Sequence, residues 1–301
     1  VATAKGDGTF AAEGEYQTLE EAMSAAKGNA NRVVRDMNRT KGNGVVYMSE
    51  GQVITTPTKV GGVILTYGNE HYNTYVAEGY DAQLVSTNGV DVSIQLMGMK
   101  GAVVKTKSAQ PIDQVELVPP AHIEAVSYYE NKDGQLTHVL QSFRYDKAEN
   151  GWSADAYRIY LGPAPEFMKP ETRYYSYSAS AFYTDRAQTN SVGNFEPYYK
   201  NLSFRTQTVY TAEELDAYIA SWNQPKSKLM GVGKDLKRLE SEYGINALML
   251  LAMASHESAK GMSEIAQTKN NLFGVRATDD NPLKNATEFK TVAEALEYQA
   301  K

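Results

Sequence analysis

Residues 245–258 read Ile-Asn-Ala-Leu-Met-Leu-Leu-Ala-Met-Ala-Ser-His-Glu-Ser, and this stretch decides the fold of the last third of the chain. Nine of the ten residues from Ile245 to Ala254 are apolar, which predicts a helix that is buried on nearly all sides. Gly244 precedes the stretch and is typical of a residue that ends a helix. Upstream of Gly244, five apolar residues recur every three or four positions and predict an amphipathic helix: Leu229, Val232, Leu236, Leu239 and Tyr243.

Capping signals extend the helical pattern in both directions. Thr211 with Glu214, and Thr291 with Glu294, each form the Thr-x-x-Glu pattern of a capping box, in which the two residues satisfy each other's backbone N–H groups. We therefore predict helices that begin after Thr211 and after Thr291. Residues 211–301 are predicted to form one helical lobe.

The first part of the chain has a different pattern. A capping box at Thr18 and Glu21 predicts one helix that ends near Gly28. Short β-like runs separated by Gly and Asn follow it, and they predict a small β-barrel or meander, SH3-like, within a mixed α/β module at residues 1–118. The predicted strands are Arg32–Asp36, Val45–Met48, Val53–Thr56, Gly62–Tyr67, Tyr75–Gly79, Ala82–Ser86, Asp91–Met97 and Gly101–Lys105.

Tyrosine marks the middle of the chain, because twelve of the 21 tyrosines fall between Tyr128 and Tyr210. Aromatic runs at Tyr157–Leu161 and Arg173–Tyr183 predict strands of a Tyr-rich β module at residues 119–210. Two interpretations remain open. The rings either cover half-buried faces of a β-rich fold, or they stack on sugar rings.

The composition argues against several classes of function. A chain of 301 residues with 42% hydrophobic side chains can bury a sizeable core and form two or more domains. The longest apolar run is about half of the ~20 residues that a membrane span needs. A net charge of -6 without any Lys/Arg run disfavours nucleic acid and suits a neutral, hydroxyl-rich partner such as a glycan. With no cysteine, and four histidines that lack metal-ligand spacing, we predict neither a metal site nor a cofactor.

Glu257 is the main candidate for chemistry. The apolar helix runs directly into Ser255-His256-Glu257-Ser258, so the Glu257 carboxyl could lie at its end against an apolar wall, where desolvation disfavours the charged form. A carboxylic acid that keeps its proton near neutral pH is what the leaving oxygen of a glycosidic bond requires. The alternative is an ordinary helix-end glutamate exposed to water.

A family resemblance favours the interpretation of Glu257 as a proton-donating acid. The stretch from Tyr243 to Pro282 resembles the bacterial cell-wall endo-β-N-acetylglucosaminidases of glycoside hydrolase family 73, which act as autolysins. The resemblance rests on the Glu-Ser pair that ends the apolar helix and on Asn-Asn-Leu-Phe-Gly at residues 270–274. The Tyr-rich region, with Gly162-Pro163-Ala164-Pro165-Glu166-Phe167 and Tyr174-Tyr175, also resembles the region that precedes the catalytic module in some larger members.

The resemblance implies an α+β multidomain protein, in which β-rich N-terminal modules are followed by a lysozyme-like helical lobe. Glu257 would be the general acid that cleaves the β-1,4 bond between N-acetylglucosamine and N-acetylmuramic acid in peptidoglycan. Asn271 to Gly274 would form the edge of the cleft, with Phe273 packing rather than touching sugar. The candidate substrate-binding residues are Asn271, Phe273, Gly274, Asp280, Tyr174 and Tyr175. In our own interpretation, Asn270-Asn271 caps the preceding helix and Gly274 permits a close backbone approach.

The sequence departs from the family pattern after the acid. Members commonly read Glu-Ser-Gly-Trp-Gly, whereas this chain has Glu257-Ser258-Ala259-Lys260-Gly261. The large flat contact of the Trp is therefore missing. Lys260 either favours the ionised form of Glu257 or points into solvent.

The second carboxylate of a glycosidase is not assigned from the sequence. The candidates are Asp279, Asp280 and Glu288, and a turn role is preferred for the two aspartates. The substrate's own acetamido group could assist in place of a second carboxylate.

The last predictions concern the two ends of the chain and the place where the protein acts. The chain begins at Val1 and stops at Lys301, within a helix, whereas family modules continue, so we expect a processed or recombinant fragment with a truncated module. We expect a secreted, cell-wall-associated protein of a Gram-positive bacterium that functions in cell separation or in remodelling of the wall, with peptidoglycan strands and other cell-wall polymers as partners. The alternatives are a non-catalytic wall-binding protein and a muramidase or lytic transglycosylase.

Overall fold

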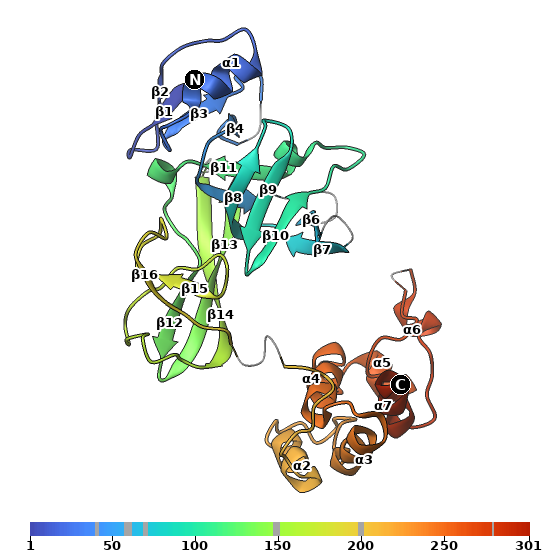
Figure 1. The fold of residues 1–301 in the computed structure, drawn as a ribbon. Coiled ribbons are helices and arrows are strands. Elements are labelled where there is room, and N and C mark those ends of the chain that lie inside the picture. The colour runs from blue at the N-terminus through green and yellow to red at the C-terminus, as the bar shows by residue number, and fades with distance from the viewer. Residues whose placement is uncertain (40–41, 57–61, 69–71, 147–150, 198–201, 279) are drawn as a thin grey trace. The chain divides into compact units, whose positions relative to one another are not determined.

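The computed structural model describes residues 1–39, 42–56, 62–68, 72–146, 151–197, 202–278 and 280–301, except the side chains at 145, 146, 151 and 152. The chain divides into two compact units, Val1–Lys200 (unit 1) and Asn201–Lys301 (unit 2), which are described separately. Figure 1 shows unit 1 as mainly strands and unit 2 as helices, so the predicted α+β class is confirmed. In the part of the chain that is described, no helix is long and apolar enough to cross a membrane.

Unit 1 begins with a small sheet and one helix. The sheet has the order β2-β1-β3-β4, and helix α1 packs beside it with Ala22 and Ala26 buried. Both halves of the Thr18–Glu21 capping box are formed, as the sequence predicted. The elements are β1 (Ala2–Ala4), β2 (Phe10–Ala12), α1 (Leu19–Ala26), β3 (Arg32–Arg35) and β4 (Val45–Tyr47).

A seven-stranded antiparallel sheet follows, in the order β11-β5-β8-β9-β10-β6-β7. Alternating buried residues, as in β9, place one face of the sheet against the core, which includes Leu65 and Ile94. The predicted strand Gly62–Tyr67 matches β6, and the other predicted strands agree to within a few residues. The elements are β5 (Gln52–Thr55), β6 (Gly62–Tyr67), β7 (Tyr72–Ala77), β8 (Asp81–Thr87), β9 (Val92–Leu96), β10 (Met99–Val103), the 3₁₀ turns Pro111–Gln114 and Pro120–His122, and β11 (Val115–Val118).

A third sheet has the order β12-β13-β14, and the predicted strand Tyr157–Leu161 lies within β14, which is longer than predicted. The predicted strand Arg173–Tyr183 is wrong over most of its length, because only its last three residues form a strand, β15. Most of that segment instead packs on the sheet as loop, with isolated bridges such as Tyr129 to Tyr174. The elements are β12 (Tyr128–Lys132), β13 (Gln135–Asp146), β14 (Gly151–Pro163), β15 (Ala181–Tyr183) and β16 (Ser191–Asn194).

The seven-stranded sheet and the third sheet are joined by a buried carboxylate. Asp81 in β8 accepts hydrogen bonds from both the backbone N–H and the hydroxyl of Ser127, which directly precedes β12. Gln52 in β5 donates to the same carboxylate (3.4 Å) and to the carbonyl of Ala125 (2.7 Å). Burial raises the pKa of Asp81, while the hydrogen bonds oppose that rise. These bonds tie residues 125–127 to the sheet of residues 52–118.

Unit 2 is helical and has a separate core. The four residues Leu229, Val232, Leu236 and Leu239 of the predicted apolar stripe are buried, and α3 packs against α4 and α7. The predicted helix is wrong over its first turn, because α3 begins at Gly233 and Leu229 and Val232 lie before it. Gly244 caps α3 in the left-handed conformation (φ 68°), as its position predicted. The helices are α2 (Ala212–Ala220), α3 (Gly233–Tyr243), α4 (Ala247–Glu257), α5 (Glu264–Lys269), α6 (Pro282–Asn285) and α7 (Val292–Ala300).

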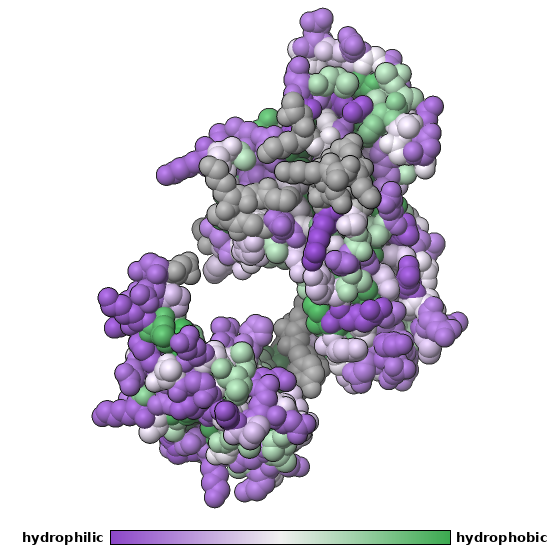
Figure 2. All heavy atoms as spheres, turned by 180° about the vertical axis from the view of Figure 1, so that it is seen from behind, coloured by the Kyte–Doolittle hydropathy of each residue, from purple (hydrophilic) through white to green (hydrophobic). Residues whose placement is uncertain are grey.

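One face of the protein is drawn as a space-filling view in Figure 2. On the face drawn in Figure 2, hydrophilic side chains predominate and hydrophobic ones lie in small, separate patches. In unit 2 the exposed aromatic and aliphatic side chains include Tyr210, Tyr218, Met230, Met262 and Tyr298.

Candidate functional site

Helix α4 places Glu257 at its last position. Leu250, Leu251 and Ala254 are buried, whereas Leu248 and Met253 are half-buried and Ala252 is exposed. The helix is therefore less completely buried than its composition predicted. The Glu257 side chain is exposed, so the expectation that it lies against an apolar wall is wrong in this structure. The buried residues of α4 point into the core of unit 2, whereas Glu257 lies on the exposed side of the last turn, between the buried Ala254 and Ser258.

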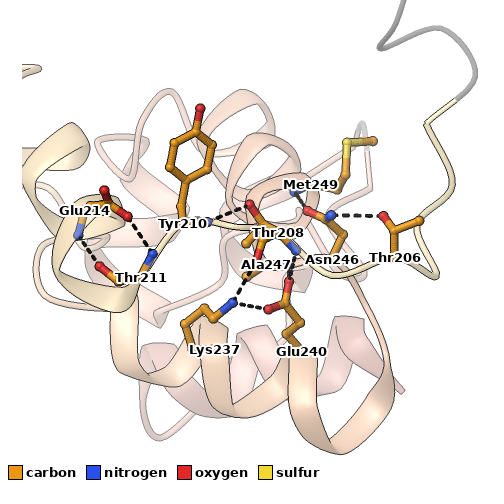
Figure 3. A network of polar contacts seen from close by, with 10 residues as sticks. All are labelled: Thr206, Thr208, Tyr210, Thr211, Glu214, Lys237, Glu240, Asn246, Ala247 and Met249. Carbon is orange, nitrogen blue, oxygen red and sulfur yellow. Dashed lines mark hydrogen bonds and ion pairs between the residues drawn. The ribbon is translucent and has the colours of Figure 1, made fainter.

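A polar network holds the start of α4 (Figure 3). One carboxylate oxygen of Glu240 in α3 accepts the backbone N–H groups of Ala247 (2.9 Å) and Thr208 (2.7 Å). Its other oxygen accepts the ammonium of Lys237. Asn246 caps α4 by accepting the N–H of Met249 (3.1 Å). Glu240 therefore satisfies an otherwise unpaired donor at the first residue of α4.

Glu240 is a buried carboxylate that is kept ionised. Its side chain is 3% exposed, and burial alone would raise its pKa. The hydrogen bonds from Ala247, Lys237 and Thr208 outweigh burial, so the pKa of Glu240 is lowered from its usual value. The charge is therefore used to fix α3, α4 and the segment before α2 to one another, rather than for proton transfer.

Ser258, directly after Glu257, closes the other end of α4. Its side chain is completely buried, and its hydroxyl donates to the carbonyl of Ala254 and accepts the N–H of Gly261 (2.7 Å). The Ser258 carbonyl also accepts the N–H groups of Met262 and Ser263. This side chain fixes where α4 stops, and so fixes the backbone that carries Glu257.

Asn271 organises the loop that follows α5. It is 1% exposed, and its amide donates to the carbonyls of Val275 (3.0 Å) and Thr287 (2.9 Å). Its carbonyl oxygen accepts the N–H groups of Phe273 (3.3 Å) and Val275 (3.0 Å). All the hydrogen-bonding groups of this amide are engaged with the backbone, so the residue shapes the loop rather than binding a ligand directly.

The neighbours of Asn271 have packing and turn roles. Asn270 caps α5 in the left-handed conformation (φ 52°), which confirms the capping interpretation. Phe273 is partly buried against the core of unit 2, as expected for a packing residue. Gly274 has φ 63°, but the nearest atom to an added Cβ would be that of Ala277 at 3.9 Å. The predicted close backbone approach is wrong, because Gly274 is needed for its conformation and not for space.

Asp280 is exposed and forms part of a turn. It accepts hydrogen bonds from Thr278 and from the amide of Asn285, and the Thr278 hydroxyl is the main cause that lowers the pKa of Asp280. This agrees with the turn role that was preferred from sequence. The neighbouring candidate Asp279 lies outside the described residues.

Tyr174 and Tyr175 lie in unit 1 and are buried. Tyr174 is 2% exposed, and its hydroxyl accepts the N–H of Lys169 (2.8 Å) and donates to the carbonyl of Phe167 (3.3 Å). Tyr175 is 9% exposed and packs with Tyr128 and Val139. Their environments match the packing interpretation and offer no ring face for stacking on a sugar.

The sequence analysis did not single out three side chains near the end of α4, those of Ser227, Lys228 and Trp222. Ser227 donates to the carbonyl of Lys260 (2.6 Å), and Lys228 donates to the side-chain oxygen of Asn270 (3.0 Å). The ammonium of Lys260 lies 5.4 Å from the centroid of the Trp222 ring. One signal was available, since Trp222 is one of only two tryptophans in the chain. Among the described residues, no group of three or more His, Cys, Asp or Glu could hold a metal ion.

The C-terminal segment is similar to known proteins. Residues 233–301 match the family described as "Glucosaminidase: Mannosyl-glycoprotein endo-beta-N-acetylglucosaminidase". Two proteins of Streptococcus pneumoniae, one from serotype 4 strain TIGR4 and one from strain R6, are each named "Putative endo-beta-N-acetylglucosaminidase", and each is 29% identical over 226 residues. The alignments cover 74% of this chain but 30% and 28% of the two relatives. Because each alignment of 226 residues is longer than unit 2, the similarity extends into unit 1.

Proposed function

We propose that the chain, whose residues 233–301 carry a glucosaminidase-family segment, is part of a peptidoglycan hydrolase in which Glu257 is the general acid. The family match carries this proposal, because the matched segment contains both α4 with Glu257 and the loop organised by Asn271. The names of the two pneumococcal relatives support a glycoside hydrolase of the endo-β-N-acetylglucosaminidase type.

The position of Glu257 suits proton donation to an external polymer. Cleavage of a glycosidic bond requires a proton on the leaving oxygen as the bond breaks. The Glu257 carboxyl is exposed at the end of a helix whose two ends are fixed by Glu240 and Ser258. A glycan strand can therefore reach the carboxyl. By covering it, the strand would exclude water from the site of proton transfer.

The bond that we propose is the β-1,4 bond between N-acetylglucosamine and N-acetylmuramic acid. No second carboxylate of this chain is assigned as base or nucleophile. Asp280 is engaged by Thr278 and Asn285 within its own turn, which makes it a poor candidate. The acetamido group of the substrate is a possible nucleophile in glycosidases that lack a second carboxylate.

Reducing-end analysis of purified peptidoglycan tests the proposal. We expect incubation with the chain to produce new N-acetylglucosamine reducing ends, and we expect Glu257→Gln to abolish them. Glu264→Gln is a matched control, since Glu264 begins the next helix and is also in the matched segment. Circular dichroism of both variants checks that the fold is retained.

Each other outcome would replace the proposal with a stated alternative. New N-acetylmuramic acid reducing ends, or 1,6-anhydro ends, would assign a muramidase or a lytic transglycosylase. Full activity in Glu257→Gln would refute its role as the acid. Binding to cell walls without any cleavage would favour a wall-binding protein.

We also propose that the modules at residues 1–118 and 119–210 place the enzyme on the cell wall outside a Gram-positive cell, where it would act in cell separation. Support comes from the similarity to the pneumococcal relatives, which reaches beyond the glucosaminidase segment into unit 1. Pulldown on purified walls compares the chain with a version that lacks the segment Val1–Lys200, which is one compact unit. Equal retention of both would refute a targeting role.

A further inference from the structure

The turn after Glu257 has an unusual backbone. Ala259, Lys260 and Gly261 have φ values of 50°, 58° and 75°, so three consecutive residues lie in the left-handed region. Two of the three carry side chains, for which this conformation costs free energy. Such strain persists only where the surroundings determine it, and it is often found at functional sites.

Hydrogen bonds from several segments hold this turn. The Lys260 N–H donates to the carbonyl of Ser255 (2.6 Å), and the Lys260 carbonyl accepts the hydroxyl of Ser227, which is 6% exposed. The carbonyl of Gly261 accepts the side-chain amide of Gln267 (2.7 Å) and the N–H of Lys228 (3.2 Å). The turn is therefore rigid, and it presents the Lys260 side chain at a fixed place three residues after Glu257.

The Lys260 side chain meets an aromatic pair from α2 and the residues after it. Its ammonium lies 5.4 Å from the centroid of the Trp222 ring, within the range of a cation–π contact. The Tyr218 ring meets Trp222 edge to face, with centroids 5.5 Å apart and planes at 82°. Tyr218 is 56% exposed, Lys260 is exposed and Trp222 is half-buried, so the three side chains form an accessible surface.

The chemistry of these side chains selects one kind of ligand. An exposed aromatic ring offers its face to the C–H face of a pyranose ring, and a tyrosine hydroxyl can bond to sugar hydroxyls. An ammonium held beside it attracts a carboxylate. A sugar that carries its own carboxylate satisfies both features, whereas a neutral N-acetylglucosamine unit satisfies only the first.

We infer that Tyr218, Trp222 and Lys260 form a subsite for a carboxylate-bearing N-acetylated sugar, with Lys260 binding the carboxylate and the aromatic pair contacting the ring. The inference rests on the proposed function, because the subsite lies next to Glu257 along the chain. It goes further by naming the sugar unit that lies beside the proposed acid. It also gives a role to Lys260, which stands where the sequence departs from the family pattern.

Binding measurements with three probes test the subsite in a Glu257→Gln background, where the glycan stays intact. The probes are peptide-free glycan strands with free lactyl carboxylates, the same strands with those carboxylates converted to amides, and chitin oligosaccharides. We expect Lys260→Met to weaken binding of the carboxylate strands about tenfold and to leave the other two probes unchanged, because only the charge pair is lost. We expect Tyr218→Ala to weaken all three probes about threefold.

Two surface variants are matched controls. Lys234→Met removes an exposed lysine from α3, and Tyr298→Ala removes a 57% exposed tyrosine from α7. Neither should change the binding of any probe. Equal binding of the carboxylate strands before and after Lys260→Met would overturn the inference, as would an equal loss for the amidated strands.

The subsite and the proposed function can fail separately. A chain that binds carboxylate strands through Lys260 but produces no new reducing ends would keep the subsite and refute the hydrolase. A chain that cuts peptidoglycan through Glu257, with unchanged binding in Lys260→Met, would keep the hydrolase and refute the subsite.

Discussion

Removal of the Glu240 carboxylate should destabilise unit 2 strongly. In Glu240→Ala, the N–H groups of Thr208 and Ala247 lose their acceptor, and Lys237 loses its charged partner. A buried donor without a partner costs about 1–3 kcal/mol; the Ala247 N–H is buried and the Thr208 N–H is part-buried, so we predict a loss of roughly 3 kcal/mol. Lys237 adds little to this loss, since its side chain is 30% exposed and can turn into water.

Glu240→Gln separates the charge from the hydrogen bonds. The amide oxygen of Gln can still accept both N–H groups, but the bonds are no longer charge-assisted, and such bonds are roughly half as strong. We therefore expect a loss of about 2 kcal/mol, between wild type and Glu240→Ala. Because the folded pKa of Glu240 is lowered, its stabilising contribution is present above the unfolded pKa near 4.5 and is lost as pH falls through the folded value. Glu240→Gln should lack this pH dependence.

Urea denaturation followed by tryptophan fluorescence measures both effects. The chain has two tryptophans, and a Trp152→Phe background leaves Trp222 as the reporter of unit 2. Glu213→Ala, an exposed glutamate in the first turn of α2, is a control that should change the free energy of unfolding by less than about 0.5 kcal/mol. A Glu240→Ala transition that coincides with that of the background protein would refute the reasoning.

Three further predictions concern other buried or capping groups. Asn271→Ala should lower the stability of unit 2 by about 2–4 kcal/mol, because four backbone groups lose their partner, and urea denaturation should show this; a loss below ~1 kcal/mol would contradict it. Thr211→Ala should cost about 1 kcal/mol by the same assay, whereas Thr211→Ser should cost less, since it keeps the capping oxygen. Burial lowers the pKa of His138 to about 4, so unit 1 should lose stability as pH falls from about 6.5 toward 4; His138→Gln should abolish that slope in pH-dependent thermal melts, and an unchanged slope would refute the assignment.

Local signals in the sequence predicted many of the elements of unit 2. The capping residues lie only three apart, so the helices after Thr211 and Thr291 could be predicted without knowledge of the fold. The box at Thr211 is complete, whereas at Thr291 only the threonine half forms, and the Glu294 carboxylate accepts the N–H of Lys290 instead. The same holds for the end of α3 at Gly244, where a left-handed conformation favours glycine. The spacing of Leu236 and Leu239 predicted a buried stripe for the same reason, since helical periodicity is a local property.

Predictions that depended on distant partners were less successful. The aromatic run Arg173–Tyr183 has strand-forming residues, but most of it packs as loop over the third sheet. The roles of Asn271 and Glu240 are set by backbone groups up to 32 residues away, which no motif specifies. The sequence also could not decide whether Lys260 favours the ionised form of Glu257 or points into solvent. The structure places the Lys260 ammonium over the ring of Trp222, 38 positions upstream.

The sequence by itself determined that the last third of the chain is a helical lobe, that one glutamate follows its most apolar helix, and that the Asn270-Asn271 pair follows the next one. Only the tertiary structure decided that Glu257 is exposed, that Tyr174 and Tyr175 are buried, and that Trp222 lies beside Lys260. The physical reason is that helix periodicity and capping depend on neighbours within one turn. The exposure of a side chain depends instead on which remote segments the core brings against it.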